Sequence, residues 1–210
     1  MICHILPIQS DRSENNKTPF QYKSRTKFSL FFLIHSSYFV LFIMSLTEKA
    51  TFAAGCFWGV EHIFNKYHKK DGITTRVGYI GGELDNPTYQ QVKTGTTNHA
   101  EACEVTFDPT KISYETLVEF FYKLHDPTTE NYQGPDIGTQ YRSAIFYHNE
   151  EQKEIAERVT KEVQEKHYPN ARIVTKIEPA TKFYDAEEYH QFYLEKNPEG
   201  YACPTHYLRW

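Results

Sequence analysis

The sequence predicts an α+β fold, a two-layer sandwich in which helices pack on a mixed central sheet. Short apolar segments typical of buried strands alternate, loosely, with longer segments whose apolar residues recur at helical spacing. Aromatic residues make up 16% of the 210 residues, so the chain can build a large hydrophobic core. Because no glycine-rich phosphate loop follows the first expected strand, a regular doubly wound fold is not expected.

The chain divides near Met44 into an N-terminal extension, residues 1–43, and a main domain, residues 44–210. The extension carries basic residues and leads into an apolar stretch, residues 28–44, whose 17 residues are at the short limit for crossing a bilayer. We expect that the extension is not part of the working protein, which would then begin at Met44 as a cytoplasmic protein. The alternative is a targeting or membrane-anchoring segment.

The first half of the main domain contains alternating strand and helix patterns. Residues 50–54 are short and apolar and precede a glycine, as expected of a buried strand that leads into a turn. Apolar side chains then recur at helical spacing at Phe57, Val60, Phe64 and Tyr67. Residues 77–79 and 100–107 are predicted strands, ended by Gly-Gly and Asp-Pro. Residues 113–124 are predicted to form an amphipathic helix.

The second half begins with a long loop of Pro, Thr, Asn, Gly and Asp, a composition typical of functional loops. The loop is expected at residues 126–138. A strand at residues 143–147, a helix at residues 150–166 and a strand at residues 172–177 are expected to follow. Asp185 and Glu188 resemble a capping box, which predicts a helix that continues to about Leu194. Residues 197–204 are predicted to be irregular and flexible.

Charge and cysteine content exclude several classes of protein. The formal net charge of −4 argues against a nucleic-acid-binding protein, which would normally be basic. The four cysteines, at positions 3, 56, 103 and 203, are too few and too scattered for a disulfide scaffold, and none shows C-x-x-C spacing. We therefore expect a compartment that keeps thiols reduced.

Cys56 is the most informative residue, since it lies between a predicted strand and a predicted helix. The unsatisfied N–H groups and the positive dipole end of a helix N-terminus favour a thiolate, so we expect the pKa of Cys56 to be lowered. Phe57 and Trp58 would supply apolar walls beside the sulfur. The alternative is that Cys56 is a small buried hydrophobic residue, which is the usual role of a free cysteine.

Glu101 is the second candidate for chemistry. The pattern His99-Ala100-Glu101 is found in zinc deaminases, but these also need P-C-x-x-C, and the chain offers only Cys203-Pro204. Without a metal, a strand carboxyl group facing a thiol can act as a general acid if an apolar environment raises its pKa. The alternative is a solvated acid on a strand surface.

The remaining cysteines and His190 receive different interpretations. Cys103 shares a strand face with Glu101 and is predicted to serve packing. Cys203 lies in a segment flanked by glycine and proline, where a mobile thiol could form a disulfide with a reactive cysteine. His190, next to acidic residues, is expected on a solvated helix surface rather than at a metal. The sequence does not support a catalytic dyad of Cys56 and His190.

Eight segments of the main domain, beginning with GCFWGVE, together match one known family in order and spacing. They are residues 55–61, 77–82, 86–89, 98–101, 125–128, 134–143, 183–191 and 197–201. In these segments the chain resembles the A-type peptide methionine sulfoxide reductases. The resemblance covers residues 50–209 and excludes residues 1–43. It implies that residues 44–210 are the catalytic domain and that the fold is a ferredoxin-like plait with extensions.

The resemblance also implies a role for each residue at the catalytic centre. Cys56 would attack the sulfoxide sulfur as a thiolate, and Glu101 would deliver a proton to the sulfoxide oxygen. Tyr89 and Tyr141 would hydrogen-bond that oxygen, and Asp136 occupies a nearby polar position. The S-methyl group would be held by Phe57 and Trp58.

The resemblance further implies a redox cycle. Cys56 would become a sulfenic acid, Cys203 would condense with it, and thioredoxin would reduce the disulfide. Residues 204–210 contain no further cysteine, so the Cys56–Cys203 disulfide must suffice. The substrates would be the S epimer of methionine sulfoxide, free or in oxidised proteins, so that the enzyme repairs oxidative damage. We expect a cytoplasmic monomer without metal or organic cofactor. The competing hypotheses are a thiol peroxidase and a non-enzymatic module, either methionine-binding or redox-sensing, that uses Cys56 as a switch.

Overall fold

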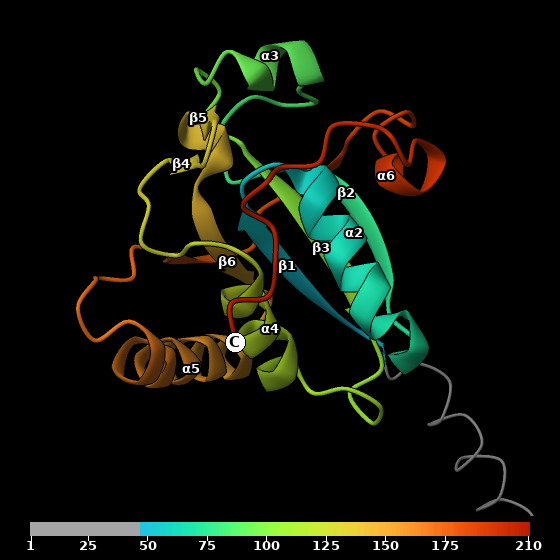
Figure 1. The fold of residues 1–210 in the computed structure, drawn as a ribbon. Coiled ribbons are helices and arrows are strands. Elements are labelled where there is room, and N and C mark those ends of the chain that lie inside the picture. Colours follow the sequence, from blue (N-terminus) through green and yellow to red (C-terminus); the bar gives the residue numbers. More distant parts are fainter. Residues whose placement is uncertain (1–46) are drawn as a thin grey trace, which may run out of the picture. The chain divides into compact units, whose positions relative to one another are not determined.

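The computed structural model describes residues 47–210 (Figure 1). The expectations for residues 1–43 therefore lie outside the described residues. Within residues 47–210, none of the helices has both the length and the apolar character that a membrane span requires.

The central sheet has six strands in the order β7-β6-β1-β3-β2-β8. The strands are β1 (Glu48–Ala54), β2 (Thr74–Ile80), β3 (Ala100–Phe107), β6 (Ser143–Tyr147), β7 (Lys176–Pro179) and β8 (Tyr184–Asp185). Neighbouring strands are antiparallel, except that β6 and β7 are parallel. The inner order β6-β1-β3-β2, with a helix after β1 and another after β3, is that of a ferredoxin-like plait, and β7 and β8 extend its edges. The predicted mixed sheet is confirmed.

Helices cover one face of this sheet and enclose the core. The long helices are α2 (Phe57–His68), α4 (Tyr114–Leu124) and α5 (Glu150–His167), and Figure 1 shows α2 and α4 lying over the strands. Phe52 of β1 stacks on Phe64 of α2 and on Phe121 of α4, with ring centroids 5.4 and 5.2 Å apart. Burial of each such ring contributes about 2 to 3 kcal/mol, so this triplet fastens both helices to the middle strand.

The starts of two predicted helices are explained by side-chain caps. Ser113 accepts a hydrogen bond from the N–H of Thr116 at 3.1 Å, and Asn149 accepts one from the N–H of Gln152 at 2.9 Å. Each cap satisfies a donor that the first turn of a helix leaves free. The expected helix at residues 113–124 is therefore found as α4 with Ser113 as its cap.

The predicted helix at residues 185–194 is wrong. The carboxylate of Asp185 binds Arg76 on β2 at 2.7 Å instead of capping a helix, and Asp185 ends β8. Turns follow, and only α6 (Tyr193–Lys196) is helical. Phe192, which precedes α6, has a φ of 53°, a left-handed conformation that interrupts any continuous helix.

Other differences are smaller. The predicted strand at residues 172–177 begins only at Lys176, because the N–H of Val174 bonds to the carbonyl of Pro127 rather than to β6. The expected loop at residues 126–138 contains a short hairpin. Its strands are β4 (Tyr132–Gln133) and β5 (Asp136–Ile137). Sequence patterns also did not indicate α3 (Tyr89–Lys93), which a Thr88–Gln91 capping box begins.

Candidate active site

Cys56 is held in a tight turn between β1 and α2. It is the cap residue of α2, and its carbonyl accepts the N–H of Val60 at 3.4 Å. The preceding Gly55 has a φ of 90°, and a Cβ there would come within 2.7 Å of Gln133, so the turn requires glycine. The Cys56 side chain is only 7% exposed. The predicted placement of a cysteine at a helix N-terminus is therefore confirmed.

The expected lowering of the Cys56 pKa is wrong for the substrate-free protein. Burial raises the pKa of the thiol well above 9.0, and the neighbouring Glu101 carboxylate raises it further. The N–H groups of Trp58 and Gly59 act in the opposite direction, as the helix-terminus argument requires. Desolvation outweighs them, so the resting thiol is protonated at neutral pH.

Glu101 lies beside this turn rather than at a solvated strand surface. Its side chain is 2% exposed, and its Oε2 accepts the N–H of Phe57, the residue after Cys56, at 3.2 Å. Burial raises the pKa of Glu101 to about 8, which the Phe57 hydrogen bond opposes only in part. The expected raised pKa is therefore found, and the carboxyl group is mainly protonated at pH 7. The solvated-acid alternative is wrong.

Two tyrosines and an aspartate share the same electrostatic environment. Burial raises the pKa of Tyr89 to about 12 and also raises the pKa of Tyr141, and the Glu101 and Cys56 charges contribute to both. Both hydroxyl groups therefore stay protonated and can donate hydrogen bonds. Tyr89 begins α3, and Tyr141 ends a 3₁₀ turn after β5. Asp136 on β5 accepts hydrogen bonds from the hydroxyl of Tyr201 at 3.2 Å.

Phe57 and Trp58 form an apolar wall that other residues hold in place. Phe57 is 1% exposed and packs against the rings of Tyr79 and His190. Trp58 stacks on Tyr193 with ring centroids 3.7 Å apart and donates its Nε1–H to Nδ1 of His190 at 3.0 Å. The structure thus brings both predicted methyl-binding residues to the start of α2.

His190 is buried, so its expected position on a solvated helix surface is wrong. It is 1% exposed, and burial lowers the pKa of its imidazole. Because Nδ1 accepts the indole hydrogen of Trp58, the neutral ring carries its own hydrogen at Nε2. His190 therefore supports Trp58. Within residues 47–210, no cluster of three or more His, Cys, Asp and Glu side chains is arranged to hold a metal ion.

The other described cysteines differ in position. Cys103 is fully buried in the core cluster beneath α2 and α4, which confirms its packing role. Cys203 is 4% exposed, with its Sγ 3.1 Å from Oγ1 of Thr205 and 4.0 Å from the carbonyl oxygen of Gln133. The side chain of Gln133 also touches the turn at Gly55. Cys203 and the turn that carries Cys56 therefore both contact Gln133. Cys56, Cys103 and Cys203 are free thiols in this structure.

His206 is a residue of the site that sequence reasoning missed. Its Nε2–H donates to the carbonyl of Ala54 at 2.7 Å, and its backbone N–H bonds to the carbonyl of Cys203 at 3.3 Å. A Cβ on Gly59 would lie 2.1 Å from its ring, so the helix start and the histidine are in close contact. His206 thus fastens the segment that carries Cys203 to the end of β1. A lone histidine in an irregular tail carries no signal of this contact.

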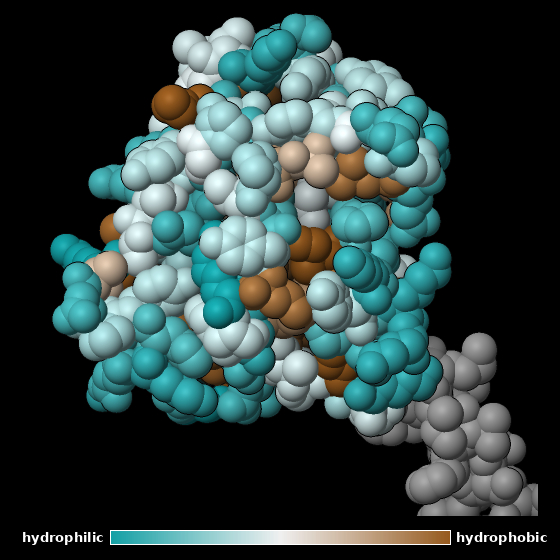
Figure 2. Space-filling view, in the orientation of Figure 1, coloured by the Kyte–Doolittle hydropathy of each residue, from teal (hydrophilic) through white to brown (hydrophobic). Residues whose placement is uncertain are grey.

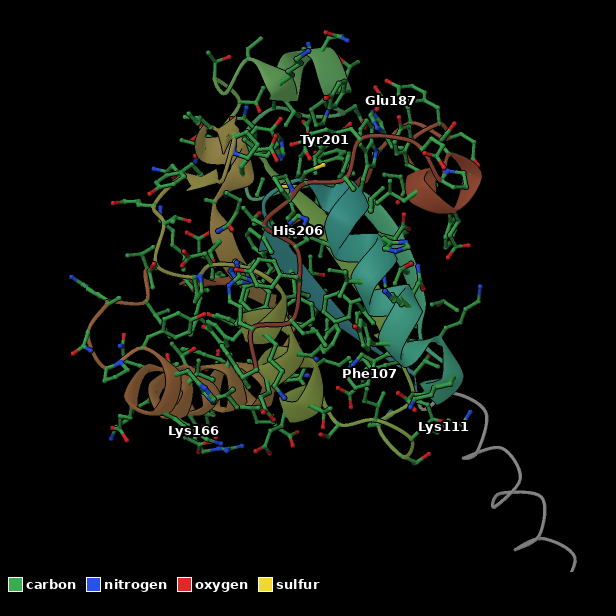
Figure 3. The ribbon with its side chains drawn as sticks, viewed as in Figure 1. Phe107, Lys111, Lys166, Glu187, Tyr201 and His206 are labelled. Atoms are coloured by element: carbon green, nitrogen blue, oxygen red, sulfur yellow. The ribbon has the colours of Figure 1, made fainter. Side chains whose placement is uncertain are left out.

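Glu187 was also missed, and it joins three parts of the site. Its Oε2 accepts the hydroxyl hydrogen of Tyr79, and its Oε1 accepts the N–H of Tyr89, both at 2.9 Å. Figure 3 shows Tyr201 and His206 along the C-terminal segment beside the start of α2, with Glu187 between α3 and α6. On the face seen in Figure 2, apolar side chains reach the surface in several places, one of them near the middle.

A buried thiol beside a protonated carboxyl group, with phenol donors and a second thiol close by, defines the site of a thiol-dependent oxidoreductase. The comparisons with known proteins agree. The model of the family "Peptide methionine sulfoxide reductase" matches residues 48–208. The chain belongs to this family, whose members reduce methionine sulfoxide, and the resemblance seen in the sequence is confirmed.

Two relatives, the second of them in two solved structures, illustrate the similarity. A probable peptide methionine sulfoxide reductase of Schizosaccharomyces pombe is 59% identical over 165 residues, 78% of this chain and 97% of the relative. The crystal structure of Mxr1 from Saccharomyces cerevisiae in reduced form has a TM-score of 0.74 and 47% identity, covering 78% of this chain and 93% of that one. The crystal structure of Mxr1 in complex with Trx2 has a TM-score of 0.54 and 33% identity, and the match covers 78% of this chain and 91% of that one.

Proposed function

We propose that this chain reduces the S epimer of methionine sulfoxide, free and within oxidised proteins, through chemistry at Cys56. The observation that carries the proposal is the hydrogen bond from the N–H of Phe57 to the buried carboxyl group of Glu101. It holds a proton donor with a pKa of about 8 beside the nucleophile. Expulsion of an unprotonated oxide is costly, so a general acid at this position is what the reaction needs.

The first step transfers the sulfoxide oxygen. The S-methyl group lies against Phe57 and Trp58, and the oxygen faces Glu101 and the hydroxyl groups of Tyr89 and Tyr141. Glu101 protonates the oxygen, which makes the substrate sulfur more electrophilic, and Sγ of Cys56 attacks as its thiol proton is lost. The bond between the substrate sulfur and the oxygen breaks, and the oxygen passes to Sγ as a hydroxyl group. The substrate sulfur gains two electrons and leaves as methionine, and Cys56 becomes a sulfenic acid. The thiol proton replaces the one that Glu101 gave.

The raised pKa of Cys56 fits this order of events. The resting thiol is protonated, because burial raises its pKa well above neutral pH. Glu101 is itself mainly neutral at pH 7, and the N–H groups of Trp58 and Gly59 act in the opposite direction by stabilising a thiolate. The thiol proton is therefore lost only as Sγ attacks, when it can replace the proton that Glu101 gives to the sulfoxide oxygen.

The second step closes a disulfide. The thiol of Cys203 attacks the sulfenic sulfur of Cys56, an S–S bond forms, and water leaves. Support comes from the contacts of Gln133, which touches both the Cys56 turn and Cys203. A dithiol partner then reduces the disulfide. The partner we propose is thioredoxin, and the complex of the yeast relative Mxr1 with Trx2 supports it.

The remaining assignments complete the proposal. The enzyme works as a monomer in the cytoplasm, without metal or organic cofactor, and repairs oxidised proteins. The net charge of −4 supports the expectation that it does not bind nucleic acid. Where residues 1–43 are translated and retained, association with an organelle or membrane is the alternative location.

Single-turnover experiments on cysteine variants test this proposal. Cys203→Ser should form about one methionine per protein molecule and then stall with thioredoxin, because the sulfenic acid has no resolving thiol. Cys56→Ser should form none. Cys103→Ser is the matched control, since Cys103 lies in the core and should retain turnover. Sustained turnover of Cys56→Ser would refute the assignment, and sustained turnover of Cys203→Ser with thioredoxin would remove Cys203 from the cycle.

A further inference from the structure

Glu61 is a buried carboxyl group that the proposed mechanism does not use. It lies on α2, three residues after Trp58, and its side chain is 2% exposed. Burial raises its pKa to about 7. Acidic side chains are seldom buried in this way without hydrogen-bond partners, so its contacts indicate what it does.

The two oxygens of Glu61 join α2 to two other segments. Oε2 accepts the backbone N–H of Phe192 at 2.7 Å. Oε1 accepts the hydroxyl hydrogen of Thr75 on β2 at 3.2 Å, and that hydroxyl in turn accepts a hydrogen bond from Asn65 at 2.8 Å. The Phe192 contact is with the backbone, at the residue whose left-handed conformation begins α6. Glu61 therefore fixes the path of the chain at this point.

The residues on either side of Phe192 hold the indole of Trp58. His190 accepts its Nε1–H at 3.0 Å, and Tyr193 stacks on its ring with centroids 3.7 Å apart. Both contacts depend on where the chain lies at Phe192. A carboxyl group on the same helix as Trp58 thus sets the position of the two side chains that grip Trp58.

We propose that Glu61 is a positioning residue for the substrate-binding wall, which acts by fixing the backbone at Phe192 so that His190 and Tyr193 hold Trp58 in place. This inference rests on the proposed function, in which Trp58 contacts the S-methyl group. Cys56 and Glu101 are held by other contacts, namely the Gly55 turn and the N–H of Phe57. Loss of the Glu61 contact should therefore weaken substrate binding more than the chemical step.

The side chain at position 61 needs an acceptor rather than a charge. In Glu61→Gln, the amide oxygen can still accept the N–H of Phe192, and the NH₂ group can donate to the hydroxyl of Thr75. In Glu61→Met, a side chain of similar length fills the space but leaves the N–H of Phe192 without its acceptor. The two variants therefore separate the hydrogen bond from simple packing.

The first test is steady-state kinetics with a methionine sulfoxide peptide. Glu61→Met should raise KM about 10-fold with kcat within about threefold of wild type, and Glu61→Gln should stay close to wild type. Glu188→Met is the matched control. Glu188 is an acid four residues before Phe192, its side chain is 89% exposed, and it pairs with Lys196 at the surface. It should leave both constants unchanged.

The second test reads Trp58 directly. The chain has two tryptophans, and in a Trp210→Phe background the remaining fluorescence is that of Trp58. Acrylamide should quench Trp58 more strongly in Glu61→Met than in Glu61→Gln or in the parent variant, because the indole loses its stacked and hydrogen-bonded neighbours. If Glu61→Met does not fold, Thr75→Val, which removes the second partner of Glu61, should show the same changes at smaller size.

Three results would overturn the inference. The first is an unchanged KM together with unchanged quenching in Glu61→Met. The second is a rise in KM in Glu61→Gln as large as that in Glu61→Met. The third is a fall in kcat of Glu61→Met with its KM unaltered. The quenching experiment needs no turnover. If the wild-type protein formed no methionine, the proposed function would fail, and quenching would still show whether Glu61 positions Trp58.

Discussion

Cys56 experiences two opposed effects, and their balance sets its chemistry. The helix N-terminus stabilises a thiolate, as the sequence predicts, but burial of the sulfur and the nearby Glu101 raise its pKa. A site of this kind keeps the resting thiol protonated, and in the proposed mechanism the thiol loses its proton only when it attacks a bound substrate. After removal of Cys56 itself, removal of the acidic proton of Glu101 should therefore reduce the rate of sulfoxide reduction the most.

Substitution of Glu101 tests its role as a proton donor. Glu101→Gln keeps the acceptor for the N–H of Phe57, so the turn at Cys56 should stay in place. Loss of the acidic proton should slow the reduction of a methionine sulfoxide peptide by about 10² to 10⁴-fold in single-turnover measurements. A variant that reduced the sulfoxide at a rate within a few-fold of wild type would show that Glu101 does not act as the acid.

At the scale of elements, the C-terminal segment determines where Cys203 can reach. His206 fastens this segment to the carbonyl of Ala54, and the segment continues to Trp210, which stacks on His167 of α5 at 3.9 Å. Cys203 therefore belongs to a span held on its C-terminal side by side-chain contacts. These contacts hold Cys203 beside Gln133, which also contacts the Gly55 turn, and so they should raise the effective concentration of this thiol at Cys56.

Substitution of His206 tests this attachment. Glutamine can place an N–H donor where Nε2 lies, so His206→Gln should preserve disulfide formation between Cys56 and Cys203. His206→Leu lacks the donor and should slow that step about 10-fold, while formation of the first methionine stays within about twofold of wild type. The two steps are followed separately by methionine release and by thiol titration. Equal slowing of both steps in His206→Leu would contradict a role in positioning Cys203.

Helices and strands are predicted correctly where local sequence patterns determine them, and wrongly where a contact distant in sequence does. Residues 100–107 and 143–147 form strands with the bounds that their apolar patterns predict, because nearly every residue of both strands is buried. The capping-box pattern at Asp185 fails because its carboxylate finds Arg76, a partner 109 positions away in sequence. Local patterns carry no information on such distant contacts.

The site shows the same limit. Cys56 and Glu101 stand out in sequence because their chemistry and the family motifs point to them. His190, Glu187 and His206 support the site through hydrogen bonds to segments distant in sequence, and only the fold reveals them. The pKa of Cys56 could not be predicted either, because it depends on burial that the helix terminus alone does not determine.

For the whole molecule, two buried carboxyl groups make stability depend on pH. Burial raises the pKa of Glu101 to about 8 and that of Glu61 to about 7, from 4.5 in both cases. A raised pKa means that the folded protein holds these protons more tightly than the unfolded chain. The resulting stability is fully present below pH 4.5 and is lost as pH rises through 7 and 8.

Glu101→Gln should remove part of this dependence. Between pH 5 and pH 9, the free energy of unfolding of wild type should fall by about 4 kcal/mol relative to that of the variant. Urea denaturation at a series of pH values measures it, and Glu188→Gln, an exposed acid, should follow wild type within about 0.5 kcal/mol. Parallel curves for wild type and Glu101→Gln would show that the Glu101 pKa is not raised in the folded protein.

The central claim, that Cys56 takes the sulfoxide oxygen and Cys203 resolves the product, is tested most directly by mass spectrometry. The reduced protein is exposed once to a methionine sulfoxide peptide without reductant, and its intact mass and peptide map are recorded. The account predicts a loss of two hydrogens and a disulfide between the peptides that contain Cys56 and Cys203, with about one methionine formed per molecule. An unchanged mass, or a disulfide that does not include Cys56, would contradict it.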